Sequence, residues 1–85
     1  MNSQAKELLQ QFAAAANKDI LHPLDQERFY GFACRVHALR LQATAQDVLL
    51  FLAANGFTEK KAEELAFLFD ELKDCLTYYD KLKED

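Results

Sequence analysis

The chain has 85 residues, 51% of them hydrophobic, with only two glycines and one proline. This length allows one domain at most, and the composition favours helices and excludes a disordered chain. Ten basic against fourteen acidic residues give a net charge of −4, which argues against binding to the phosphate backbone of a nucleic acid.

The first predicted helix spans roughly residues 3–16. Ser3 is a suitable N-cap, because its hydroxyl can accept a hydrogen bond from a free backbone N–H. An apolar stripe at three- and four-residue spacing follows: Leu8, Leu9, Phe12, Ala13 and Ala16. In the next loop, Pro23 ends one helix and begins another, and we expect Ile20 and Leu24 to pack into the core.

The second predicted helix, residues 24–42, is apolar around most of its circumference. One face carries Phe29, Phe32, Ala33, Val36 and Leu39, and a neighbouring arc carries Tyr30, Cys34, His37 and Leu41. Only a narrow row, Arg28, Gly31 and Arg35, is left to solvent, so we expect this helix at the centre of the fold. Gly31 is about 1 kcal/mol less favourable than Ala in mid-helix, which predicts close approach of a neighbouring backbone or ring.

The third predicted helix, residues 45–54, begins with the clearest local signal in the chain. "TAQD" at 44–47 matches a capping box, in which Thr44 caps the helix and Asp47 bonds back to it. Gly56 supplies the left-handed turn that ends the helix. The apolar residues 48–52 leave no polar face, so we expect burial on nearly every side.

The fourth predicted helix, residues 59–81, is capped by Thr58 and has a broad apolar inner arc. That arc consists of Ala62, Leu65, Leu68, Phe69, Leu72, Cys75, Leu76 and Tyr79. The acidic residues outside it form a face partly neutralised by Lys60, Lys61 and Lys73. Four helices with short connections predict an all-α, compact four-helix bundle, a single domain over 1–85. Because the third helix is short, an irregular or orthogonal arrangement is as probable as a regular up-down one.

Two surfaces could bind a protein partner or a second copy of the chain. Phe67, Glu71, Asp74 and Tyr78 form one strip of the fourth helix, two rings with acids between them, which is typical of a contact surface. The alternative is that the first helix packs there and both rings are core. Arg28 and Arg35 form a second candidate surface of opposite charge, which could support a homodimer.

Catalytic and metal chemistry have weaker signals. Cys34 and His37 are three residues apart on one helix, and we expect Cys34 to be a small buried core residue with His37 at the core edge. The alternative is a reactive pair in a thiol-dependent enzyme or redox protein. The potential soft metal ligands, these two with His22 and Cys75, lack the paired spacing of a zinc site. We therefore expect a non-catalytic protein without metal or cofactor.

The N-terminal segment has no basic region followed by an apolar stretch, so no signal peptide is predicted. The longest apolar run, residues 48–54, is far short of the roughly 20 residues that cross a bilayer. We expect a cytoplasmic protein with free thiols, no membrane segment and no nucleic-acid partner.

Two resemblances to known families accompany these patterns. "ERFYGFACRVHALRLQ" and "QDVLLFLAANGFTEKKAEELAFLFDELKDCLTYY" are similar in layout to the C-terminal helical region of BatD-type (oxygen-tolerance) bacterial proteins. That resemblance implies a bacterial accessory or interaction module, and it transfers no site residue. The shorter "NGFTEKKAEELAFL" resembles the loop and second helix of ubiquitin-associated domains, with Asn55 in place of their methionine.

Overall fold

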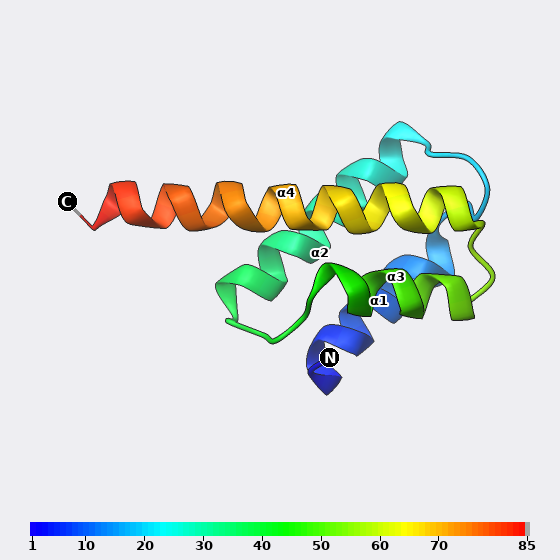
Figure 1. Ribbon diagram of the computed structural model, residues 1–85, viewed down its shortest axis with the longest axis horizontal. Coiled ribbons are helices and arrows are strands. Elements are labelled where there is room, and N and C mark those ends of the chain that lie inside the picture. The colour runs from blue at the N-terminus through cyan, green and yellow to red at the C-terminus, as the bar shows by residue number, and fades with distance from the viewer. Residues whose placement is uncertain (85) are drawn as a thin grey trace.

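The computed structural model describes residues 1–84 and consists of four α-helices joined by short loops (Figure 1). The helices are α1 (Ser3–Ala15), α2 (Pro23–Ala38), α3 (Ala45–Ala54) and α4 (Glu59–Lys83). Residues 1–84 contain no β-strand, so the predicted all-α four-helix bundle is confirmed.

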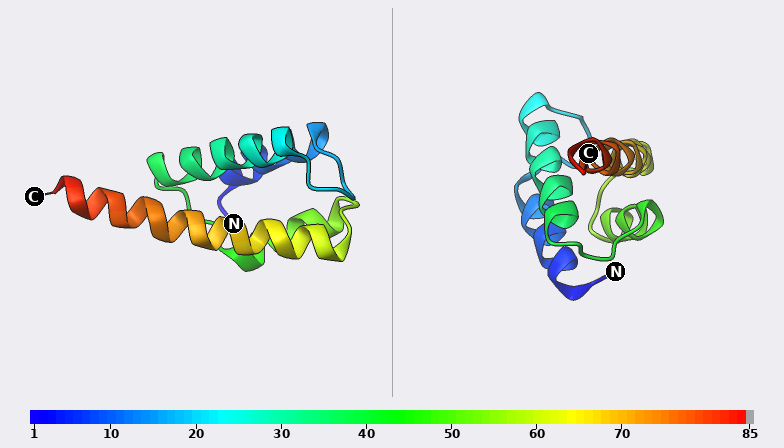
Figure 2. Two further views of the ribbon diagram at one scale, coloured as in Figure 1. Left: turned by 90° about the horizontal axis from the view of Figure 1, so that it is seen from above. Right: turned by 90° about the vertical axis from the view of Figure 1, so that its left-hand side faces the viewer.

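The helices form two layers, which are seen end-on in Figure 2. One layer contains α1 and α2, and the other contains α3 and α4, which run antiparallel on either side of a tight turn at Gly56. Gly56 has a φ of +88°, a conformation that glycine adopts without steric penalty. Because α4 is much longer than α3, its C-terminal part extends beyond the rest of the molecule (Figure 1).

The core is a cluster of five buried phenylalanine rings: Phe12, Phe29, Phe32, Phe57 and Phe69. They come from α1, α2, the α3–α4 turn and α4, so the cluster joins both layers. The Phe29 ring centroid lies 5.2 Å from that of Phe12 and 6.4 Å from that of Phe69, both in edge-to-face geometry. Such pairs are favourable beyond the area they bury, and the cluster fixes α2 against α4.

The helix caps agree closely with local sequence signals. Thr44 and Asp47 form the predicted capping box, with both reciprocal bonds at 3.1 Å, and Thr58 caps α4 through the N–H of Lys61. In α1 the prediction is wrong by one residue: Asn2 is the N-cap, and its side-chain oxygen accepts from the N–H of Gln4 at 2.8 Å.

α2 packs against both α1 and α4, but the expectation that only a narrow row of this helix is left to solvent is wrong. The helix ends at Ala38 rather than at residue 42, because Arg40 adopts a φ of +53° and the Leu41 N–H donates to the Val36 carbonyl. Leu39, expected in the core, is 53% exposed. One face of α2 is buried, and Tyr30 lies outside it in contact with solvent.

Cys75 and Tyr79, expected on the inner arc of α4, are exposed, because the end of α4 extends beyond the other helices.

Three further predicted core positions are also wrong. Ile20 is 69% and Leu24 is 55% exposed, because the α1–α2 loop is held by polar contacts rather than by these side chains. In α3, Val48 and Leu52 are fully buried but Leu50 faces solvent, since this helix packs on α4 along one side. A Cβ added at Gly31 would meet no atom within 4 Å, so the expected close neighbour is not present in residues 1–84.

Candidate functional site

The strip of α4 formed by Phe67, Glu71, Asp74 and Tyr78 is exposed along its whole length. Phe67 and Tyr78 have 66% and 63% of their surface accessible, and both carboxylates between them are exposed. The alternative prediction that these rings are core is therefore wrong. The physical reason is that α1 packs against α2, in the other layer, and does not cover this side of α4.

The strip extends along one face of α4. Its residues follow each other at spacings of four, three and four, so they lie on one side of α4. At a rise of 1.5 Å per residue, Phe67 and Tyr78 are about 16 Å apart along the axis. The arrangement is an acidic centre between two large rings, all in contact with solvent.

Arg28 and Arg35 lie at a shallow groove between α1 and α2. The groove encloses about 300 Å³ and is lined by Leu8, Gln11, Phe12, Ala15, Arg28, Gly31, Phe32 and Arg35. Its lining combines apolar side chains with two arginines, and the Arg28 guanidinium lies 3.7 Å from the Asp25 carboxylate. The groove and the α4 strip belong to different layers, so the structure does not bring these two predicted surfaces together.

Cys34 and His37 do not form a nucleophile–base pair. Cys34 is exposed, which corrects its expected burial, and within residues 1–84 no hydrogen bond joins it to His37. The His37 ring instead bonds Asp80 of α4, with 2.6 Å between Nε2 and Oδ2. Sequence reasoning did not find Asp80, because 43 positions separate it from His37 and no local pattern links them.

A second groove, of about 250 Å³, opens between α2 and α4 next to this pair. It is lined by Ala33, Val36, His37, Arg40, Leu41, Phe69, Lys73 and Thr77. Cys34 is not part of this lining, so the thiol and the groove face different surroundings. The groove combines apolar side chains with the basic residues Arg40 and Lys73, and its Lys73 and Thr77 side chains donate to backbone carbonyls.

A cluster of buried charged residues lies at the N-terminal end of α4. It joins this helix to the α1–α2 loop and to the first turn of α2. Lys61 Nζ donates to the backbone carbonyls of Asn17 and Ile20, the second at 2.8 Å, and lies 3.4 Å from Asp25 Oδ2. Asp25 also accepts from the Asn17 N–H at 3.0 Å. The prediction placed Lys61 in a solvated face, whereas 1% of its surface is accessible. We interpret this cluster as structural, since every polar group in it is engaged within the fold.

Two further observations concern metal ligands and titratable groups among the described residues. Within residues 1–84, no three His, Cys, Asp or Glu side chains are placed to share a metal ion. The pKa of Asp47 is below its ordinary value, chiefly because its carboxylate accepts a hydrogen bond from the Thr44 N–H. This shift belongs to a helix cap and not to a reactive group.

No helix in the described part of the chain is long and apolar enough to span a bilayer. Comparison with protein-family models, curated proteins and solved structures gives no match for this chain.

Proposed function

We propose that the protein is a small, non-catalytic interaction module that binds a protein partner, or another copy of itself, through the α4 strip. The exposure of Phe67 and Tyr78 on an otherwise acidic helix face is the observation that carries this proposal. Exposed aromatic rings are enriched in protein interfaces, where they act as anchors inside a polar rim.

The strip defines the chemistry of a suitable partner. Two apolar pockets or side chains about 16 Å apart would receive the rings. Basic groups between them would pair with Glu71 and Asp74, which contribute to orientation and association rate. Arg28 and Arg35 offer the complementary chemistry on a separate surface, so an acidic partner segment could be bound there. A cytoplasmic location and a bacterial accessory role belong to the same proposal.

Capture from extracts of the source cells tests the strip, with the full chain as bait. The double variant Phe67→Ser, Tyr78→Ser removes both rings, and because both are exposed the fold is expected to persist. Leu50→Ser is the matched control, since it removes an exposed apolar side chain, 59% accessible, from α3. We expect wild type and Leu50→Ser to capture the same partner and the double variant to lose it. Equal capture by all three chains would refute the strip.

A thiol-dependent function is the alternative, and the feature that favours it is the solvent exposure of the Cys34 thiol, without a base from His37, which bonds Asp80. The rate of Cys34 alkylation against pH tests this function, with Cys75 as an internal reference. A midpoint near pH 8.5 for both thiols would exclude an activated Cys34.

A further inference from the structure

The groove of about 250 Å³ between α2 and α4, which we call the α2–α4 groove, lies on a different side of α4 from the strip. It is formed by the last turns of α2, the loop that follows and the middle of α4. Lys73, which lines it, comes six residues after Phe67 of the strip. At 100° per residue these two side chains are rotated by about 240° around the helix axis. The α2–α4 groove is therefore separate from the surface of the proposed function.

One part of the lining of the α2–α4 groove is apolar. Ala33, Val36 and Phe69 are buried residues of the core, and Leu41 is half-buried against them. The volume corresponds to on the order of eight water-sized groups at about 30 Å³ each. It is below the roughly 300–1,000 Å³ of pockets that take drug-sized ligands. A ligand of this groove must therefore be small.

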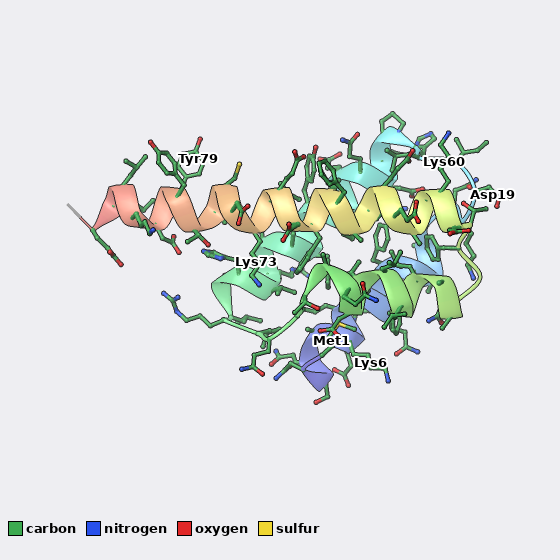
Figure 3. All side chains as sticks on the ribbon, viewed as in Figure 1. Met1, Lys6, Asp19, Lys60, Lys73 and Tyr79 are labelled. Atoms are coloured by element: carbon green, nitrogen blue, oxygen red, sulfur yellow. The ribbon has the colours of Figure 1, made fainter. Side chains whose placement is uncertain are left out.

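The other part of the lining is basic, and among residues 1–84 it includes no carboxylate. Arg40 contributes from the loop after α2 and Lys73 from α4, and within the same residues neither forms an ion pair. Lys73 Nζ lies 3.4 Å from the Ala43 carbonyl, a long contact that engages one of its three N–H donors. In Figure 3, Lys73 projects from α4 toward the segment between α2 and α3.

The other polar side chains at this place are engaged within the fold. The Thr77 hydroxyl donates to the Lys73 carbonyl at 2.8 Å. Asp80, one turn further along α4, could neutralise a basic neighbour, but its Oδ2 lies 2.6 Å from His37 Nε2. Arg40 and Lys73 are therefore the groups of this groove that can bind an anion.

Arg40 has a backbone conformation that glycine adopts more easily. Its φ of +53° lies in the left-handed region, and within residues 1–84 no other non-glycine residue has a positive φ. It ends α2, since its N–H donates to the His37 carbonyl and the N–H of Leu41 donates to the Val36 carbonyl. Glycine is usual at such a position, because a Cβ there costs free energy. A long cationic side chain on a strained residue indicates a role beyond ending the helix.

We propose that the α2–α4 groove binds a small organic carboxylate with an apolar body. The carboxylate is bound by the Arg40 guanidinium, whose planar fork matches two carboxylate oxygens, and by the Lys73 ammonium. The apolar body packs against Val36, Leu41 and Phe69, where it displaces water from apolar surface. This goes beyond the proposed function, because the site is not on the strip and its ligand is not a protein.

Both parts of the ligand are needed for binding. Arg40 and Lys73 are exposed, so their attraction for a bare anion is screened by water and salt. An uncharged apolar body of this size leaves both cations without a partner. 3-Phenylpropionate combines the two parts, and we expect it to bind with a dissociation constant on the order of 0.1–1 mM.

Titration of the full chain with 3-phenylpropionate, followed by backbone amide NMR shifts, tests the site. We expect saturable shifts concentrated at residues 33–41 and 69–77. Acetate and inorganic phosphate have charge without an apolar body, 3-phenylpropan-1-ol has the body without charge, and all three should bind at least tenfold more weakly. Equal binding of the alcohol would overturn the carboxylate specificity. Absence of saturable shifts up to about 10 mM, or shifts centred on the groove between α1 and α2, would overturn the site.

Substitution of Arg40 separates binding from folding. Arg40→Gly removes the guanidinium and relieves the strained backbone, so its Tm should equal or exceed that of the wild type while its affinity for 3-phenylpropionate falls at least tenfold. Arg40→Gln keeps a Cβ and loses the charge, and it should weaken binding to a similar extent. Arg35→Gln is the matched control, because Arg35 is an exposed arginine of the other groove. Wild-type affinity in either Arg40 variant, or an equal loss in Arg35→Gln, would overturn the proposal.

Discussion

Lys61 and Asp25 form a buried ion pair that joins the start of α4 to the first turn of α2, with 3.4 Å between Nζ and Oδ2. Their side chains are 1% and 6% accessible. The same ammonium group donates to two carbonyls of the α1–α2 loop and lies 5.6 Å from the centre of the Phe57 ring. One cation thus holds three segments that are distant in sequence.

Lys61→Met should therefore destabilise the fold strongly. It leaves Asp25 buried without its nearest cation and removes the donor for the loop carbonyls, and loss of one partner from a buried pair typically costs about 3–5 kcal/mol. Urea unfolding measures the change. Lys60→Met is the matched control, because Lys60 is exposed and should change the unfolding free energy by less than about 0.5 kcal/mol. Equal stability of the two variants would contradict the role of the pair.

The Lys61 cluster shows where sequence reasoning fails. Its location among charged residues at 59–64 is typical of a solvated helix face, and the groups that receive its hydrogen bonds lie 41 and 44 positions away. By contrast, the Thr44 and Thr58 caps were predictable, because a cap depends on residues within one turn. Local signals define where helices start, and the packing of distant segments decides which of their faces are covered.

Gly31→Ala should stabilise the protein. The position is helical and a Cβ there meets nothing within 4 Å, so the substitution removes the unfavourable helix propensity of glycine, about 0.5–1 kcal/mol. Gly56→Ala should have the opposite sign, because its φ of +88° is strained for any residue with a Cβ. Thermal unfolding of both variants measures this. A destabilised Gly31→Ala would show that a close neighbour does exist at that face.

The same substitution at two residues of α3 should lower the unfolding free energy by very different amounts. Leu52→Ala removes a fully buried side chain and should lower the unfolding free energy by about 2–5 kcal/mol. Leu50→Ala, two residues earlier, changes a side chain that is 59% exposed and should have an effect below about 0.5 kcal/mol. Denaturant midpoints compare them directly, and similar losses would mean that α3 is covered on both sides.

Leu50 of α3 and the strip on α4 show which features could be predicted from the sequence. The apolar run 48–52 has no polar face, so sequence could not reveal that Leu50 lies outside. The strip on α4 was predictable as a group, since its spacing is local. Its exposure was not, because that depends on α1 packing on α2 and leaving α4 uncovered.

Because of the capping box, the free energy of unfolding should depend on pH in the acidic range. The pKa of Asp47 is lower in the folded chain, so the ionised carboxylate stabilises the fold above the unfolded value of about 3.9. That contribution is lost as the pH falls through the lowered pKa. Asp47→Asn should thus be less stable than wild type at pH 7, and the difference should shrink as the pH falls below the unfolded value and through the lowered pKa. Urea midpoints from pH 2.5 to 7 measure it, with Asp19→Asn, in an exposed loop, as control. A difference that is constant with pH would contradict the assignment.

The C-terminal part of α4 should be dispensable for folding. The buried residues of α4 end at Phe69, and a chain ending at Leu76 keeps this ring and the half-buried leucines after it. It loses the contact between His37 and Asp80, and partly exposed pairs of this kind contribute about 0–1 kcal/mol. We expect cooperative unfolding with a Tm lowered by no more than about 4–8 °C. A chain ending at Leu68 lacks Phe69 and its contacts with Phe29 and Phe32, and it should not fold. If the chain ending at Leu76 also failed to fold, residues 77–83 would contribute to the stability of the bundle and the prediction would be contradicted.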